Sequence, residues 1–162
     1  MTQPVGNARS TPCTGDSGAV LTEVAIVLVL FLVLTFSFFE GGRLLWSFTT
    51  LSNAVSEGTR YASVRSRQAQ YLATETNIKT QVVNWGVGLG LSTADVTVTV
   101  VDSAGGTHGW TDTHAVGGVT IPWAQPGADV VVAAQYTYQP AIGLVPIGSF
   151  VMNTSSRMLL SR

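Results

Sequence analysis

The longest apolar stretch of the chain lies close to its N-terminus. Residues 24–39 contain no charged side chain, and counting back to Ala19 gives a run of about 21 residues. As a helix this run measures roughly 31 Å, which matches the hydrocarbon core of a bilayer. We therefore predict a transmembrane helix over residues 19–40. One carboxylate, Glu23, lies near its start, and an ionisable group within lipid marks a candidate functional residue.

Beyond this run the apolar positions recur every three or four residues, as they do on one face of a helix. The apolar stripe consists of Leu44, Phe48, Leu51, Val55, Gly58 and Ala62, and the other faces hold Ser47, Thr49, Ser52, Ser56 and Arg60. This pattern predicts one long helix that leaves the lipid and reaches about residue 70. A bend is expected at Gly41 and Gly42, because each glycine weakens a helix by about 1 kcal/mol.

The remainder of the chain changes from helical to strand periodicity. A second helix is predicted over residues 75–85, and the glycine-rich residues 86–90 end it as a turn. That turn is no phosphate-binding loop, because it follows a helix and lacks the Lys-Ser/Thr pair. Alternating apolar residues then predict strands at 96–101, 119–121, 129–138 and 149–160, with a loop at 102–114 and a Gly/Pro-rich connection at 141–147. The predicted fold is α+β, with a three- to four-stranded antiparallel sheet.

Composition narrows the functional classes. Charged residues make up 10% of the 162 residues, against about 25% in ordinary soluble proteins, and the net charge is -1. This balance, without any basic cluster, argues against binding of nucleic acid. The single cysteine, Cys13, precedes the apolar run, so one copy of the chain offers neither an internal disulfide nor a cysteine-based metal site.

The residues before the apolar run suggest a leader. Residues 1–18 are polar, and cleavage after Gly18 would leave the membrane anchor on the product, unlike cleavage of a secretory signal. An uncleaved signal anchor with a polar tail is the alternative. We divide the chain into a leader (1–18), a transmembrane helix (19–40) and an extracytoplasmic domain (41–162).

Orientation in the membrane follows from two opposing observations. The arginines after the span outnumber Arg9 before it, which alone would place the C-terminal side in the cytoplasm. Those arginines are interspersed with Glu40 and Glu57, and a short polar leader is the part most easily left inside. We predict that the N-terminus stays in the cytoplasm.

Three blocks of sequence resemble the TadE-like family of tight-adherence pilus proteins, which are related to type IV pilins. They are Gly18-Ala-Val-Leu-Thr-Glu23, Phe39-Glu-Gly-Gly-Arg-Leu-Leu45 and Leu51-Ser-Asn-Ala-Val-Ser-Glu-Gly-Thr-Arg-Tyr-Ala62. The resemblance implies cleavage by a prepilin peptidase between Gly18 and Ala19, with Glu23 as the fifth mature residue. Within the later blocks it singles out Glu40, Gly42, Arg43, Asn53, Ala54, Glu57, Gly58, Arg60 and Tyr61. Two features depart from the family pattern. Asp16 stands where a positive charge is usual before the cut, and the outer domain has no cysteine, although many relatives carry cysteines there.

Elementary chemistry gives these residues candidate roles. A buried charge without its partner is costly, so Glu23 is expected to pair with the freed amine of Ala19 in a neighbouring subunit. The alternative is that Glu23 lies at the headgroup level near a helix N-terminus. Glu40–Arg43 and Glu57–Arg60 are spaced to pair on a helix, either as ordinary solvated pairs or as links to the covering domain or to neighbouring subunits.

One glycine of the third block lies on the apolar stripe. Gly58 would let another backbone come close, which suits packing against the sheet or the second helix.

Other chemistry is weaker. Asp102, His108, Asp112 and His114 could supply metal ligands, but their spacing matches no motif, and solvated loop residues are the favoured interpretation. Trp110 and Trp123 suit either surface adhesion or core packing.

We predict a non-enzymatic, minor pilin-like assembly subunit in the cytoplasmic membrane, with no cofactor, nucleic acid or small-molecule substrate. Its expected partners are a prepilin peptidase, other pilin or pseudopilin subunits and an assembly platform, and whether it enters an extracellular pilus is left open. The alternatives are a static membrane-anchored binding module and a membrane-tethered metal-dependent enzyme that uses His108 and His114.

Overall fold

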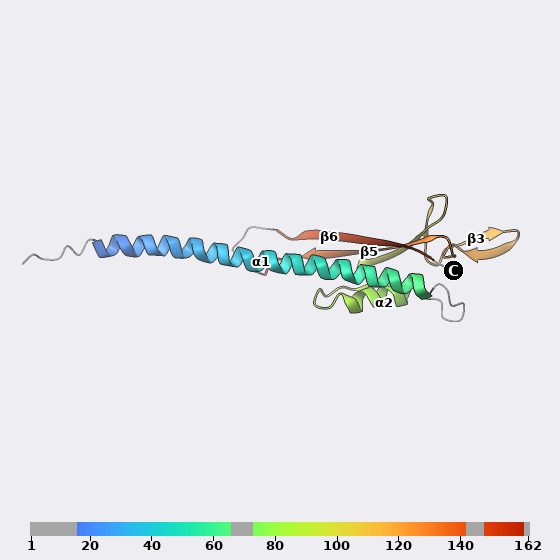
Figure 1. The fold of residues 1–162 in the computed structure, drawn as a ribbon, viewed down its shortest axis with the longest axis horizontal. Helices are drawn as coiled ribbons and strands as arrows, with labels where there is room; N and C mark the ends of the chain where they lie inside the picture. Colours follow the sequence, from blue (N-terminus) through green and yellow to red (C-terminus); the bar gives the residue numbers. More distant parts are fainter. Residues whose placement is uncertain (1–15, 66–72, 142–147, 161–162) are drawn as a thin grey trace, which may run out of the picture.

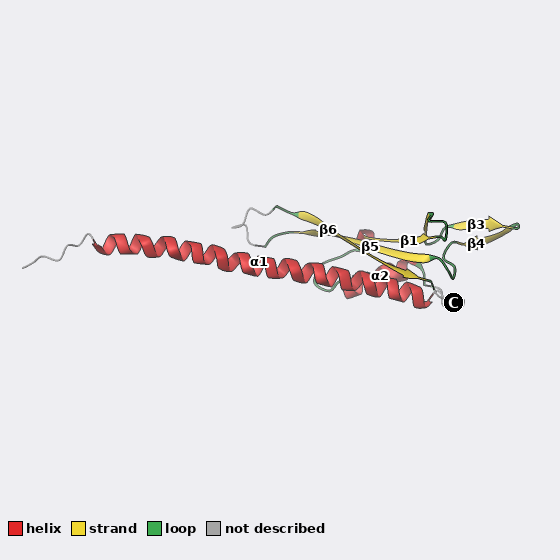
Figure 2. Ribbon diagram, turned by 45° about the horizontal axis from the view of Figure 1, so that its top comes forward, coloured by secondary structure: helices red, strands yellow, loops and turns green. Residues whose placement is uncertain are grey.

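A single long helix organises the molecule. The computed structural model describes residues 16–65, 73–141 and 148–160, and Figure 1 shows helix α1 (Asp16–Arg65) running along most of its length. At about 1.5 Å per residue these 50 residues measure roughly 75 Å. The predicted bend is wrong, because the helix continues through Gly41 and Gly42 and Figures 1 and 2 show no kink in α1. No proline interrupts this stretch, so the backbone hydrogen-bond ladder tolerates both glycines.

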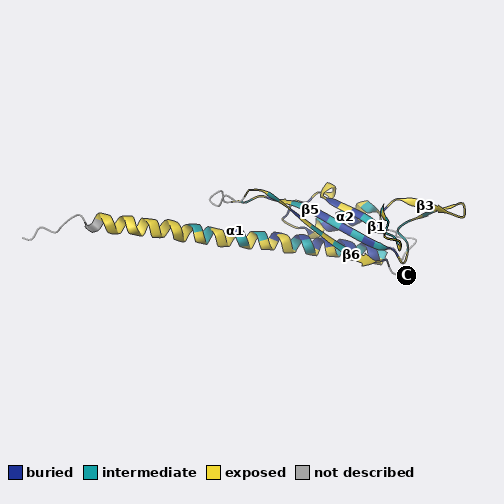
Figure 3. Cartoon of the chain, turned by 90° about the horizontal axis from the view of Figure 1, so that it is seen from above, coloured by how far each residue is buried: buried dark blue, intermediate teal, exposed yellow. Residues whose placement is uncertain are grey.

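The N-terminal half of α1 stands apart from the rest of the protein. This is the one helix, among the described residues, that is long and apolar enough to cross a membrane, and no residue of its apolar window is buried. Figure 3 shows the exposed half changing to a buried face where the sheet begins. The sheet and the second helix therefore cover only the C-terminal half of α1.

The second helix, α2 (Glu75–Trp85), has the predicted bounds. The Thr74 hydroxyl caps its start by accepting a hydrogen bond from the Asn77 N–H at 3.2 Å, as the first-turn donors of a helix require. The glycine-rich residues after α2 form the predicted turn, in which Gly88 and Gly90 adopt positive φ angles that suit glycine.

The main sheet has four antiparallel strands in the order β2-β1-β5-β6 (Figure 2). Short helix η1 (Thr93–Asp95) leads into β1 (Val96–Val101), which pairs with β2 (Thr107–Gly109) and with β5 (Asp129–Tyr138). Strand β6 (Phe150–Leu159) pairs with β5 along all ten residues. The predicted fold class is confirmed, and the boundaries of β1 and β5 are those predicted.

A separate hairpin projects beyond the end of α1 (Figure 1). It consists of β3 (Thr113–Val116) and β4 (Val119–Pro122), joined by Gly117 and Gly118, both at positive φ as a tight hairpin turn needs. The prediction of one loop over 102–114 is therefore wrong, since it contains β2 and the start of β3. Strand β4 was predicted at residues 119–121, whereas β2 and β3 are too short for an apolar alternation, and the turn at Gly117 and Gly118 sets the pairing of β3 with β4.

The core lies between the inner face of the sheet and the two helices. The alternate residues of β1 and β5 point inward, with Val96, Val98, Val100, Val130 and Val132 all buried. The predicted stripe of α1 is correct from Leu51 onward but wrong at Phe48, which is 49% exposed, and at Ser47, which is 3% exposed. The face that the sheet covers therefore includes small polar residues that no apolar pattern can reveal.

Candidate assembly site and helix–sheet joint

The predicted cleavage site lies in the first turn of α1. Gly18 and Ala19 are exposed, and the Thr22 hydroxyl donates a hydrogen bond to the Gly18 carbonyl at 2.9 Å. A peptidase that cuts after Gly18 has to open this turn. A helix end frays at little cost in free energy, so the location is compatible with cleavage.

Glu23 lies one turn further along the helix, on a surface that is otherwise apolar. With Val24, Val27, Leu28 and Phe31 it lines a shallow hollow on the outside of α1. Among residues 16–65, 73–141 and 148–160, no group forms a hydrogen bond or ion pair with the Glu23 carboxylate. In a hydrocarbon environment such a carboxylate would be expensive to leave uncompensated.

Glu40 occupies the opposite environment, although it is only 17 positions further along the same helix. Its side chain is 4% exposed, and its Oε1 atom accepts hydrogen bonds from the Tyr138 hydroxyl at 2.5 Å and the Ala141 N–H at 3.1 Å. The Arg43 guanidinium contributes a third contact at 3.3 Å. The carboxylate therefore joins α1 to the end of β5, at the level where the sheet begins to cover the helix.

The charge of this joint is balanced by a half-exposed arginine. The Arg43 guanidinium carbon lies 5.6 Å from the centre of the Tyr138 ring, within range of a cation–π contact. Burial raises the pKa of Tyr138, and the hydrogen bond to the nearby Glu40 carboxylate raises it further. The phenol therefore stays protonated at neutral pH and donates its hydrogen bond to Glu40, and hydrogen bonds to charged groups stabilise by about 1.5–3 kcal/mol.

The contact between the two helices depends on Gly58. A Cβ atom added there would lie 2.3 Å from a methyl carbon of Val82 on α2. Ala54, one turn earlier, is completely buried. The structure confirms that the glycine lets a neighbouring element come close, and that element is the second helix.

The remaining motif residues lie toward the surface of α1. Glu57 and Arg60 form an exposed pair at 3.7 Å, as expected of an ordinary solvated pair. Asn53 is exposed, and half-buried Tyr61 packs against the core with the Arg65 guanidinium carbon 5.5 Å from its ring centre. The three blocks thus divide between the uncovered helix, the Glu40 joint and the contact with α2.

Sequence reasoning missed the partners of these helix residues. Tyr138 meets Glu40 across 98 positions of sequence, and the Ser63 hydroxyl donates to the Leu159 carbonyl at 3.1 Å across 96 positions. The only signal was that the last inward position of the strand predicted over residues 129–138 is a tyrosine. A buried phenol needs a partner, but the sequence does not say which one.

His108 and His114, in the segment predicted as a loop over residues 102–114, pack against Trp123. The Trp123 ring stacks on His108 at a centroid distance of 3.7 Å and on His114 at 3.9 Å. Trp110 is buried and donates its indole N–H to the Ala73 carbonyl at 2.8 Å, so core packing is the correct alternative for this residue.

The acidic residues of this loop form turns. One Asp102 oxygen accepts the Ala104 and Gly106 N–H groups at 2.8 Å, and the other lies 3.1 Å from His108 Nε2. The backbone hydrogen bond from Gly106 and the bond to His108 lower the pKa of Asp102. Within the described residues, no three His, Cys, Asp or Glu side chains gather as metal ligands.

Comparison with known proteins identifies one family. The family model described as TadE-like protein matches residues 18–60, which confirms the resemblance over this part of the chain. No match was found among curated proteins or among solved structures. The matched segment begins at the predicted cleavage site and contains Glu23, Glu40 and Arg43.

Proposed function

We propose, on the premise of the TadE-like match over residues 18–60, that this chain is a minor pilin-like subunit for assembly of a tight-adherence pilus or secretion apparatus. The family implies involvement in pilus assembly, and the finer role is our inference. The subunit has no catalytic function. It joins or caps a fibre composed mainly of another pilin, through its N-terminal helix.

One observation supports this role above the others. The family match begins on the part of α1 that the sheet and α2 leave uncovered. This apolar surface carries a carboxylate that has no partner among the described residues. Cleavage after Gly18 would free the amine of Ala19, four positions before Glu23. In a low-dielectric environment the Glu23 carboxylate of one subunit would neutralise the amine of another. Because an unpaired buried charge costs several kcal/mol, the pair would fix the axial register of neighbouring subunits.

The proposed topology follows from the orientation predicted from the charges on either side of the span. The helix crosses the cytoplasmic membrane once, with the leader inside and the α+β domain outside. A prepilin peptidase removes the leader, and the assembly platform and other pilin or pseudopilin subunits are the proposed partners.

Replacement of Glu23 by alanine tests the proposal. We expect Glu23→Ala to abolish pilus formation while the protein stays stable in the membrane, and Ser37→Ala, which alters an exposed polar residue in the same span, to leave pili intact. The measurements are pilus counts by electron microscopy and the amount of subunit in the membrane fraction. Normal pili from the Glu23→Ala strain would favour a static binding module.

Two further measurements separate the remaining alternatives. Mass spectrometry of the purified protein should give an N-terminus at Ala19, and an intact chain from Met1 would contradict processing. An enzymatic role would instead require His114 and would be inhibited by a chelator.

A further inference from the structure

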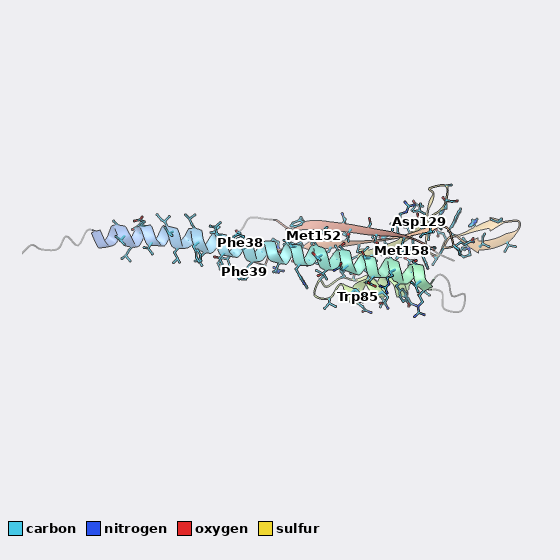
Figure 4. The ribbon with its side chains drawn as sticks, in the orientation of Figure 1. Phe38, Phe39, Trp85, Asp129, Met152 and Met158 are labelled. Carbon is cyan, nitrogen blue, oxygen red and sulfur yellow. The ribbon has the colours of Figure 1, made fainter. Side chains whose placement is uncertain are left out.

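The surface of α1 just beyond the predicted span is apolar and exposed on one side only. Glu40 and Ser47 are buried under the sheet, whereas Leu45 is 68% exposed and Trp46 53% exposed. At about 100° per residue, Leu45 and Trp46 continue the helix face that carries Phe38 and Phe39. Figure 4 labels these two phenylalanines on the part of α1 that the sheet leaves uncovered.

A second element adds to this face. The turn after α2 lies against Trp46, because a Cβ atom on Gly88 would lie 2.8 Å from the tip of the indole ring. Val87, in the same turn, is 71% exposed. We name Leu45, Trp46 and Val87 the juxtamembrane face. It is formed by two segments that are about forty positions apart, so the tertiary fold and not the span alone assembles it.

We propose that the juxtamembrane face lies in the headgroup layer of the outer leaflet and holds the folded α+β domain directly against the bilayer surface. This inference rests on the proposed function, because it assumes that residues 19–39 span the membrane. It goes further by assigning a lipid-binding surface to the folded domain. The partner is the lipid–water interface and not a second protein.

The depth of these residues supports this partner. If residues 19–39 fill the hydrocarbon core, the Cα atom of Trp46 lies roughly 10 Å beyond the end of the core. The headgroup layer is about 5–8 Å thick on each side, and helix side chains tilt toward the N-terminus, which brings the ring back into this layer.

The chemistry of the face supports the same partner. Tryptophan prefers the interface because its ring is apolar and its N–H is polar. Arg43, half-exposed beside the Glu40 joint, can reach lipid phosphates.

Trp85 provides a matched control. It is 56% exposed, similar to Trp46, but it lines a groove with Glu57 and Tyr61 at the far side of α2. Within that groove Glu57 and Tyr61 lie roughly 27–33 Å beyond Phe39 along α1, so the Trp85 side chain is directed away from the headgroup layer. Trp46 and Trp85 are therefore similarly exposed in the isolated subunit, but only Trp46 is expected to contact lipid.

The experiment compares two single-tryptophan forms of the full chain, in which the other three tryptophans are replaced by phenylalanine. Each is reconstituted into phosphatidylcholine vesicles that contain lipids brominated near the headgroup or deep in the acyl chain. We expect Trp46 to lose most of its emission, with the shallow bromine the stronger quencher, and Trp85 to keep its emission. Quenching of Trp46 no greater than that of Trp85 would overturn the proposal.

A dye label provides a second measurement in case the tryptophan replacements disturb the core. An environment-sensitive dye on Val87→Cys, in a Cys13→Ser background, should shift to the blue on addition of vesicles, while the same dye on exposed Val64→Cys should not. Flotation of the vesicles tests the membrane anchor separately from the juxtamembrane face. A chain that does not float contradicts the membrane anchor. A floating chain with unquenched Trp46 and an unshifted dye contradicts only the contact between the juxtamembrane face and the lipid headgroups. Protection of Trp46 that depends on protein density and not on bromolipid would mean that a second copy covers the face.

Discussion

The two halves of α1 show how one helix can depend on two different environments. Residues 19–39 are apolar around most of the helix and the described residues leave them largely exposed, whereas residues 40–65 present one face to the sheet and α2. Polar side chains of the first half turn to their own backbone, as Thr35 and Ser37 do by donating to the carbonyls four residues earlier. The first half therefore needs lipid or neighbouring subunits to cover it, while the second half is covered by its own chain.

The two glutamates make the same contrast. Glu23 on the uncovered half has no partner within the described residues, and Glu40 has three donors on one oxygen. A carboxylate that is satisfied within the fold stabilises the subunit. Under the proposed function, the Glu23 carboxylate is left for another chain and supports assembly instead. Substitutions on the covered half and at its contacts should therefore change the stability of the subunit.

Glu40→Ala should have the largest effect on stability. It removes the carboxylate that accepts from the Ala141 N–H and the Tyr138 hydroxyl and leaves the hydroxyl only its longer contact with the carbonyl of residue 40 at 3.3 Å, at a cost of roughly 2–4 kcal/mol of unfolding free energy. Denaturant unfolding of the full chain in detergent, followed by tryptophan fluorescence, measures it. Glu40→Gln keeps one acceptor oxygen and should be less harmful. An unfolding midpoint unchanged by Glu40→Ala would show that the joint contributes nothing to the fold.

Gly58→Ala should destabilise the contact of α1 with α2 by about 1–3 kcal/mol, because the added methyl group overlaps Val82. Gly42→Ala is the matched control, since nothing lies within 4 Å of its added Cβ, and it should stabilise the helix by about 0.5–1 kcal/mol. In the double variant with Val82→Ala the two costs should be less than additive. Strict additivity would argue that the two residues do not compete for the same space.

Tyr138→Phe should cost about 1 kcal/mol and should remove a step in the pH dependence of stability. The folded-state pKa of Tyr138 is raised above its ordinary value of 10.0, so its contribution is fully present below pH 10 and is lost as the pH rises through the folded pKa. Unfolding measured between pH 8 and pH 11, a range of about three units chosen around that value, should show the loss in the parent protein. The same alkaline step in Tyr138→Phe would assign it to another group.

Glu57→Gln should change the free energy of unfolding by no more than about 0.5 kcal/mol, because its pair with Arg60 is exposed and solvent-screened. Pilus counts for this variant sharpen the comparison with Glu40. Loss of pili from a variant of unchanged stability would mean that the exposed pair contacts a neighbouring subunit.

Local patterns predicted several elements correctly. The bounds of α2, β1 and β5 follow from periodicity and from flanking turn residues, and the helical stripe is correct from Leu51 to Ala62. Strand β4 was predicted over residues 119–121, but β3 and its pairing with β4 were not, because β3 has no apolar alternation and the pairing depends on two glycines at positive φ. The helix bend at Gly41 and Gly42 failed because a weak local preference does not break an otherwise uninterrupted helix.

Local patterns were enough to predict both α-helices, most of the strands and the length of the apolar run, because periodicity and the number of uncharged residues are local properties. They also placed Glu23 on that run and Gly58 on the covered stripe. The contacts of Glu40 with Tyr138 and of Gly58 with Val82, and the meeting of Val87 and Trp46 on one surface, depend on the folded arrangement. These contacts join positions between 24 and 98 residues apart, and the free energy that selects them comes from burial and hydrogen bonding in the assembled core, which no local window contains.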